Sequence, residues 1–319
     1  MGDLPKSRLA IDRPFAKVGV DYFGPFLIKE GGRRSKRTCK VYGCVFVCML
    51  TKAVHCEVVE SLTTEAFIAC FKRFISRRGL SAEIFCDNAT NFVGTSNELR
   101  ELYKFLESEK NAEIISDAIL QYRVKWNFNP PKAPHFGGLW EAAVKSFKNH
   151  IYKIVAHANL EFIEFYTLLI EIEGVLNSRP LIPMSSDPND LDFLTPGHFL
   201  IGDHMRVLPE LDLSEEKPNR LSRWQRIQQL RQQFWKKWSR DYVQELQRRQ
   251  KWKIPGDTTL TVGQLVLLQE DNAPSRHWKL GRVTKVHPGP DNVVRAATIK
   301  TSHGEVKRPS VRLCVLPTN

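Results

Sequence analysis

The stretch KVGVDYF, residues 17–23, alternates like a half-buried β-strand, and an acid, Asp21, closes the alternating part. Two more segments rich in Val, Cys and Phe follow at 40–50 and 52–59, after the turn GGRRSKR at 31–37. The pattern predicts three consecutive strands joined as a meander.

The next segments add helices and further strands to this meander. Residues 61–79 predict a helix with an N-terminal cap, a capping-box glutamate at Glu65 and a closing Gly79. EIFCD at 83–87 predicts a short buried strand that ends at Asp87. Downstream we expect a polar helix over 95–109, a strand at 121–126, a helix opened by Glu141 and a helix over 160–177. This order predicts an α/β layered domain with a mixed sheet.

The C-terminal part of the chain has a different organisation. Residues 179–216 hold five prolines and no sustained periodicity, which predicts a long connection that wraps the preceding domain or spans to the next. A long helix is expected over 220–252, with an aromatic stripe through Arg, Lys and Gln that we interpret as facing a core rather than stacking on bases. Short strands between Gly and Pro turns over 259–317 predict a small β-barrel.

The charge of the chain is unevenly distributed. The formal net charge is +12 and the pI is about 9.4. Residues 1–216 hold 26 Lys and Arg against 28 Asp and Glu, whereas residues 217–319 hold 21 against 7, a net charge of +14. A basic excess of this kind favours a polyanionic partner, and here it belongs to the C-terminal third.

The cysteines and the apolar runs indicate in which cellular compartment the protein is expected. The seven cysteines form no CxxC pair, and six lie in apolar runs, which is typical of buried reduced thiols in an intracellular protein. The longest apolar run, at 41–50, is about half of what a bilayer span requires. No apolar signal region follows Met1, so we expect no membrane or secretory element.

Three acids stand at the ends of predicted elements: Asp21, Asp87 and Glu141. Each one alone is explained by a helix cap or a turn. An acid within an apolar strand is costly unless a positive charge lies beside it, and three acids that meet at a sheet edge can be neutralised by a divalent cation. Ligands that are all oxygens select Mg²⁺ or Mn²⁺ over zinc.

The blocks VGVDYFGPF, FCDNATNFVG and PHFGGLWEAAVKSFK resemble the three acidic blocks of a retroviral-type integrase core, specifically the integrases of Bel/Pao LTR retrotransposons. The resemblance covers nearly the whole chain, including TPGHFLIG in the connection, the aromatic helix and the tail. It implies an α/β RNase H-like core with a mixed five-stranded sheet and helices, followed by a long helix and a small all-β SH3-like barrel. The implied domains are a lead-in linker at 1–13, the catalytic core at 14–178, an extended connection at 179–218, a basic aromatic helix at 219–253 and a DNA-binding barrel at 259–317.

The resemblance also implies an activity and its residues. Asp21, Asp87 and Glu141 are the expected catalytic carboxylates, holding two Mg²⁺ ions for which Mn²⁺ can substitute, with Asp21 bridging both. Such a site performs in-line phosphoryl transfer, processing the 3′ ends of element DNA and joining them to chromosomal DNA. A homo-oligomer is expected to bridge the two DNA ends. The expected location is the nucleus. Before it enters the nucleus, the protein is expected in the element particle or the cytoplasm.

The expected DNA contacts follow from the same resemblance. Lys145 and Lys148 lie one and two helical turns beyond Glu141 and return to its face, where similar lysines hold the element's own DNA end. Asn88, beside the second acid, is expected to bond the end nucleotides. The expected contacts in the barrel are Arg282, Lys307 and Arg308.

Two features depart from the family pattern, and other functions stay open. Asp87 and Glu141 are 54 positions apart, which is longer than in many integrases, and no paired His and Cys precede Asp21, so the N-terminal zinc module is missing. The alternative function is a catalytically idle, integrase-derived DNA-binding or scaffold protein. A simple nuclease or RNase H of the same fold is disfavoured by the barrel and the two lysines.

Overall fold

The computed structural model describes residues 12–30, 37–86, 124–128, 138–156, 158–253, 260–270, 273–291 and 293–317, with the backbone alone described at Phe128, 138–145 and 248–253. The chain divides into two compact units, an N-terminal unit of Met1–Glu173 and a C-terminal unit of Gly174–Asn319. The predicted helix over 95–109 lies outside the described residues.

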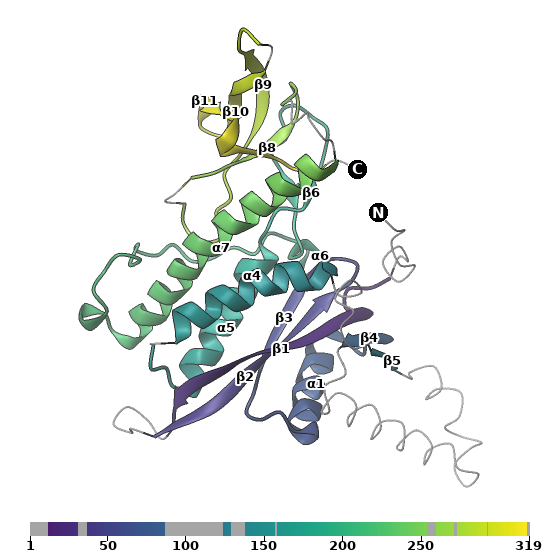
Figure 1. Ribbon diagram of the computed structural model, residues 1–319, viewed down its shortest axis with the longest axis vertical. Coiled ribbons are helices and arrows are strands. Elements are labelled where there is room, and N and C mark those ends of the chain that lie inside the picture. Colours follow the sequence, from purple (N-terminus) through teal and green to yellow (C-terminus); the bar gives the residue numbers. More distant parts are fainter. Residues whose placement is uncertain are drawn as a thin grey trace, which may run out of the picture. The chain divides into compact units, whose positions relative to one another are not determined.

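The N-terminal unit is built on a mixed five-stranded sheet (Figure 1). Its strands are β1 (Lys17–Lys29), β2 (Thr38–Cys48), β3 (Val54–Val59), β4 (Glu83–Cys86) and β5 (Lys125–Phe128), in the order β3-β2-β1-β4-β5. The predicted meander β1-β2-β3 is confirmed and antiparallel, whereas β4 pairs in parallel with both β1 and β5. This strand order confirms the RNase H-like core, although β5 begins at Lys125, later than the strand predicted at 121–126.

Successive side chains of β1 point to opposite faces of this sheet, and a helix packs on each face. Tyr22 contacts Phe67 of α1 (Thr64–Arg78), edge to face at 6.1 Å between ring centroids. Phe23, the next residue, points to the opposite face and contacts Phe147 of α4 (Gly138–Val155) at 4.9 Å. Since side chains two apart on a strand share a face, Asp21 lies on the α4 face. Helix α5 (Phe162–Asn177) packs on the α4 face through the rings of Phe26 and Phe165.

Helix α1 shows which end signals were correctly predicted. The Thr63 side chain caps the helix by accepting a hydrogen bond from the Ala66 N–H at 3.3 Å. Gly79 closes it with φ +81°, and its N–H donates to the Ile75 carbonyl at 2.8 Å. The predicted capping box is wrong, because Glu65 lies one residue too early to reach back to the cap.

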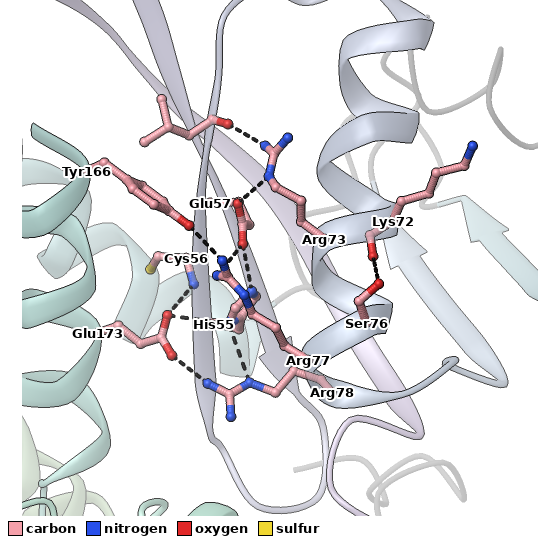
Figure 2. Close-up of polar contacts among 11 residues, drawn as sticks. His55, Cys56, Glu57, Lys72, Arg73, Ser76, Arg77, Arg78, Tyr166 and Glu173 are labelled. Atoms are coloured by element: carbon pink, nitrogen blue, oxygen red, sulfur yellow. Dashed lines mark hydrogen bonds and ion pairs between the residues drawn. The ribbon is translucent and has the colours of Figure 1, made fainter. Parts of the chain in front are cut away.

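A buried ionic network joins β3, α1 and α5 (Figure 2). The carboxylate of Glu57, fully buried, accepts from His55 Nε2 at 3.2 Å, Arg73 Nε at 2.7 Å and Arg77 at 2.8 Å. Glu173 accepts from Arg78 at 2.8 Å and from the Cys56 N–H at 2.8 Å, and it lies 3.4 Å from His55 Nδ1. Both acids are therefore matched by positive groups, as buried carboxylates require.

The network also sets the protonation of its members. Burial acts to lower the pKa of His55, but the hydrogen bonds to Glu173 and Glu57 outweigh it and raise the pKa. Burial acts to raise the pKa of Glu57, but the hydrogen bonds from His55 and Arg73 outweigh it and lower the pKa. The two carboxylates beside His55 therefore favour its charged form.

The C-terminal unit begins with short elements and a long helix. They are β6 (Ile182–Pro183), β7 (Phe193–Leu194), α6 (His198–Ile201), a 3₁₀ turn (Pro218–Arg220) and α7 (Arg223–Lys253). The aromatic stripe of α7 joins a ring cluster: Phe234 stacks on Trp238, which stacks on Tyr242, and Trp235 meets Trp278 edge to face. Phe234, Trp235 and Trp238 are buried, so the core-facing interpretation is confirmed.

Three glutamines of α7 hold the segment 211–216 along the helix. Gln229, itself buried, donates from Nε2 to the carbonyls of Leu213 and Glu216 at 2.7 Å each. Gln232 donates to the Leu211 carbonyl at 2.8 Å, and Gln233 donates to the Ser214 carbonyl at 3.1 Å. Backbone groups of an irregular segment are thus satisfied by side chains of a regular one.

The chain then forms a five-stranded antiparallel sheet in the order β11-β10-β9-β8-β12. Its strands are β8 (Leu265–Leu268), β9 (Leu280–Pro288), β10 (Val294–Thr301), β11 (Gly304–Pro309) and β12 (Leu313–Val315), with a 3₁₀ turn (Ser310–Arg312) before the last. One face of β8 packs with Val243 and Leu246 of α7, and the other encloses Val283, Ala297 and Ile299. This arrangement confirms the predicted small all-β unit.

Two expectations about the whole chain can be compared with the structure. All seven cysteines are free, and six are buried, as predicted for reduced thiols. Among the helices that the structure describes, none has the length and apolarity needed to cross a bilayer.

We predict that Glu57→Gln lowers the free energy of unfolding by about 3 kcal/mol, because it leaves buried cations without their counter-charge. The depressed pKa of Glu57 means that its stabilisation is present above the ordinary value near 4.5 and is lost as the pH falls through the lower, folded value. The raised pKa of His55 acts in the other direction, since its stabilisation is present below about 6.5 and is lost as the pH rises through the folded value.

Urea unfolding between pH 3 and 8 measures both effects. Glu60→Gln, which removes an exposed acid just after the same strand, is the matched control and should change little. A Glu57→Gln protein as stable as this control would contradict a stabilising role for the network.

Candidate active site and nucleic-acid interface

Asp21 lies on β1, the middle strand of the sheet. It pairs with Val45 of β2, and it shares the α4 face with Phe23. Its Oδ1 accepts a hydrogen bond from the Tyr22 N–H at 2.7 Å, and its side chain is 32% exposed. A strand acid at the sheet centre is therefore accessible from the α4 face.

Lys148 of α4 reaches this acid. Its ammonium contacts Asp21 Oδ2 in a charged hydrogen bond, with 24% of the lysine side chain exposed. The helix is packed into the interior before and after Lys148 in the sequence, because Phe147 and Ile151 are buried. The structure thus places one predicted DNA contact against the first predicted catalytic acid.

Glu141 lies on the same helix, seven residues before Lys148. Seven residues make two turns, or about 10 Å along the axis, so the two positions share one face. Helix α4 begins at Gly138, three residues earlier than expected, which puts Glu141 in its first turn. The side chains of Glu141 and Lys145 lie outside the described part of the chain.

The second acid follows β4, the parallel neighbour of β1. The pairing runs Lys17 to Glu83, Val18 to Ile84 and Gly19 to Phe85, and β4 ends at Cys86. Asp87 and Asn88 lie beyond it, outside the described residues. Within the ranges that are described, no three His, Cys, Asp or Glu side chains are arranged to hold a metal ion.

A second basic site lies on the outer face of the C-terminal sheet. Thr298 of β10 pairs with Lys285 of β9 on one side and with Lys307 of β11 on the other. Both lysines are exposed, and two strand spacings put their Cα atoms about 10 Å apart. His287 Nε2 lies 2.8 Å from Thr298 Oγ1, and burial, Lys307 and Lys285 together lower its pKa.

Arg308 follows Lys307 on β11 and is exposed, but Arg282 is not. The Arg282 side chain lies in the interior and donates to the carbonyls of Gly263 at 2.9 Å, Ser185 at 3.3 Å and Asp190 at 2.6 Å. Its guanidinium holds the 185–190 loop on the sheet, and a contact of Arg282 with DNA stays a prediction. A charged residue in a strand was assigned to the surface, and no sequence signal indicated the loop that covers it.

Sequence reasoning also missed residues that belong to the basic face. Lys285 and His287 lie two apart on β9, and their alternation with Val286 is visible in GRVTKVHPG. That alternation could have placed both side chains on the outer face. That Lys307 is their neighbour across β10 follows only from the register of the sheet. The buried acids Glu57 and Glu173 were missed because they stand in runs that read as apolar strand and helix.

We predict that Arg282→Leu lowers the stability of the C-terminal unit by about 2 kcal/mol, because three backbone carbonyls lose a charged donor. Thermal unfolding measures the loss. Lys285→Leu, an exposed position on the same strand, is the control and should unfold near the parent temperature. Equal stability of the two variants would show that the loop contacts of Arg282 contribute little.

The chain was compared with known families and structures. A family model described as a family of unknown function, DUF5641, matches residues 222–316. One matching solved structure is the cryo-EM structure of the simian T-cell lymphotropic virus intasome in complex with PP2A regulatory subunit B56 gamma, at 14% identity and a TM-score of 0.36, covering 97% of this chain and 82% of that chain. No curated protein matches. The family match coincides with α7 and the C-terminal sheet.

Proposed function

We propose that this chain is a metal-dependent DNA integrase of the Bel/Pao retrotransposon type, which processes the 3′ ends of element DNA and joins them to chromosomal DNA. The observation that carries the proposal is the position of Asp21. It stands on the middle strand of an RNase H-like sheet and faces the helix that bears both Glu141 and Lys148.

The register of the sheet supports a meeting of the three acids. β1 and β4 pair in parallel from Lys17 with Glu83 to Gly19 with Phe85, so both strands run in the same direction toward Asp21 and toward Cys86, the last residue of β4. Glu141 is in the first turn of α4, two turns before Lys148, whose side chain reaches Asp21. In this proposal Asp87 and Glu141 join Asp21 at one place.

The residues fit divalent ions of the magnesium class. The donors are all carboxylate oxygens. Asp21 Oδ2 already accepts a hydrogen bond from a cation, the Lys148 ammonium. In this proposal Asp21 holds both ions, and Asp87 and Glu141 hold one each. When bound, the ions supply the activation of a water or a 3′-hydroxyl and the stabilisation of the leaving oxygen.

DNA is held by basic groups of two sites. Near the acids, Lys148 and Lys145 face the phosphates of the element end, and Asn88 lies beside the end nucleotides. On the C-terminal sheet, Lys285 and Lys307 form a row of exposed cations with Arg308 next to them, suited to the phosphates of a backbone without sequence preference. We propose a homo-oligomer acting in the nucleus, where the chromosomal target lies.

A second candidate is a catalytically idle, integrase-derived DNA-binding protein. The ion pair of Lys148 with Asp21 favours it, because an acid neutralised by a lysine needs no further ligand. The two candidates share the DNA-binding surface and differ only in the chemistry at the acids.

A disintegration assay on branched DNA with Mg²⁺ or Mn²⁺ tests the enzymatic proposal. We expect the parent chain to resolve the branch and Glu141→Gln, like Asp21→Asn, to lose at least about 100-fold in rate, because each removes a metal ligand. Glu65→Gln, an exposed acid on α1, is the control and should retain the parent rate. Binding without resolution by the parent would favour the idle candidate.

Salt dependence tests the basic face of the C-terminal sheet. We expect Lys307→Gln and Lys285→Gln each to weaken duplex binding and to reduce the slope of log affinity against log salt by about 0.9, the value for one lost phosphate contact. Lys72→Gln, an exposed lysine on α1, should leave the slope unchanged. A slope that is also unchanged in both sheet variants would place the DNA elsewhere.

A further inference from the structure

Both oxygens of Asp21 are engaged. Oδ1 accepts the Tyr22 N–H at 2.7 Å, and Oδ2 accepts the ammonium of Lys148. The first bond uses a fixed backbone donor beside the strand, whereas the second uses a side chain with four rotatable bonds. Of the two, the lysine is the partner that can leave.

The packing of α4 restricts that movement to the side chain. Phe147 and Ile151, which flank Lys148 on the helix, are 1% and 0% exposed, so the backbone at Lys148 is fixed against the sheet. The lysine side chain is 24% exposed and has solvent to move into. Its ammonium can therefore leave Asp21 without any rearrangement of the fold.

A divalent ion on Asp21 needs the oxygen that Lys148 occupies. An ammonium and a metal ion at Oδ2 repel each other at short range, so each weakens the binding of the other. Once displaced, the ammonium stays on the same helical face and becomes available to another anion beside the site.

We propose that Lys148 is an exchangeable counter-ion of Asp21, which competes with a divalent ion for Oδ2 and, once displaced, binds a DNA phosphate. The inference rests on the proposed function, since it takes Asp21 as a metal ligand. It couples the two ligands: metal binding releases the ammonium for the phosphate, and by thermodynamic reciprocity a phosphate that holds Lys148 favours the metal.

The first test is Mn²⁺ binding to the full chain without DNA, measured by electron paramagnetic resonance of free Mn²⁺. We expect Lys148→Met to bind Mn²⁺ about three- to tenfold more tightly than the parent, because the competing cation is gone. Lys153→Met removes the same charge from an exposed position on the same helix and should bind like the parent. A gain of affinity is not produced by a damaged fold.

The outcomes separate this inference from the function on which it rests. If Asp21→Asn weakens Mn²⁺ binding but Lys148→Met binds no more tightly than Lys153→Met, the counter-ion role is overturned and the metal site stands. If Asp21→Asn binds Mn²⁺ as the parent does, Asp21 is not a ligand and the proposed function itself fails.

The second test measures duplex DNA affinity with and without Ca²⁺, a divalent ion used here to follow binding alone. The parent should bind DNA more tightly when Ca²⁺ is present, and this increase should shrink at least about threefold in Lys148→Met and persist in Lys153→Met. An equal increase in all three proteins would overturn the transfer of Lys148 to the phosphate.

Discussion

The parallel pairing of β1 with β4, next to the antiparallel pairing of β1 with β2, is the constraint on which the candidate site depends. It puts β4, which ends at Cys86, beside the first half of β1, which carries Asp21, and Asp87 follows Cys86 in the sequence. The alternation of β1 then turns Asp21 toward α4, whose buried residues hold the helix on that face. A one-residue slip of β1 would turn Asp21 toward α1 instead.

The acids of the N-terminal unit differ in how many partners they have. Glu57 and Glu173 are neutralised by several donors each, including His55 between them, so these charges are structural and have no capacity for a further ligand. Asp21 has one backbone donor and one lysine, and it is a third exposed. An acid with a single, mobile counter-ion can exchange that ion for a metal. Function is therefore expected at the sparsely paired acid rather than at the densely paired ones.

The sequence predicted those features that depend on local pattern. Alternation and turn residues located the meander, and helical spacing with a closing Gly79 located α1. Local pattern does not show which strand residues are covered by a distant loop, and for that reason the burial of Arg282 and the contacts of Gln229 with the segment 211–216 were not predicted. The contact of Lys148 with Asp21 lies between these cases: helical periodicity predicted the face, but only the packing of α4 on β1 identified the partner.

We propose that three acids distant in sequence bind metal together, and iron-directed backbone cleavage measures whether they do. Fe²⁺ bound in place of Mg²⁺ reduces added hydrogen peroxide to hydroxide and a hydroxyl radical, which cuts only nearby backbone, and mass spectrometry locates the cuts. We expect cuts close to Asp21, Asp87 and Glu141 together, all suppressed by excess Mg²⁺ and all lost in Asp21→Asn. Cuts at only one of the three positions, or cuts that Mg²⁺ does not suppress, would contradict a shared metal site.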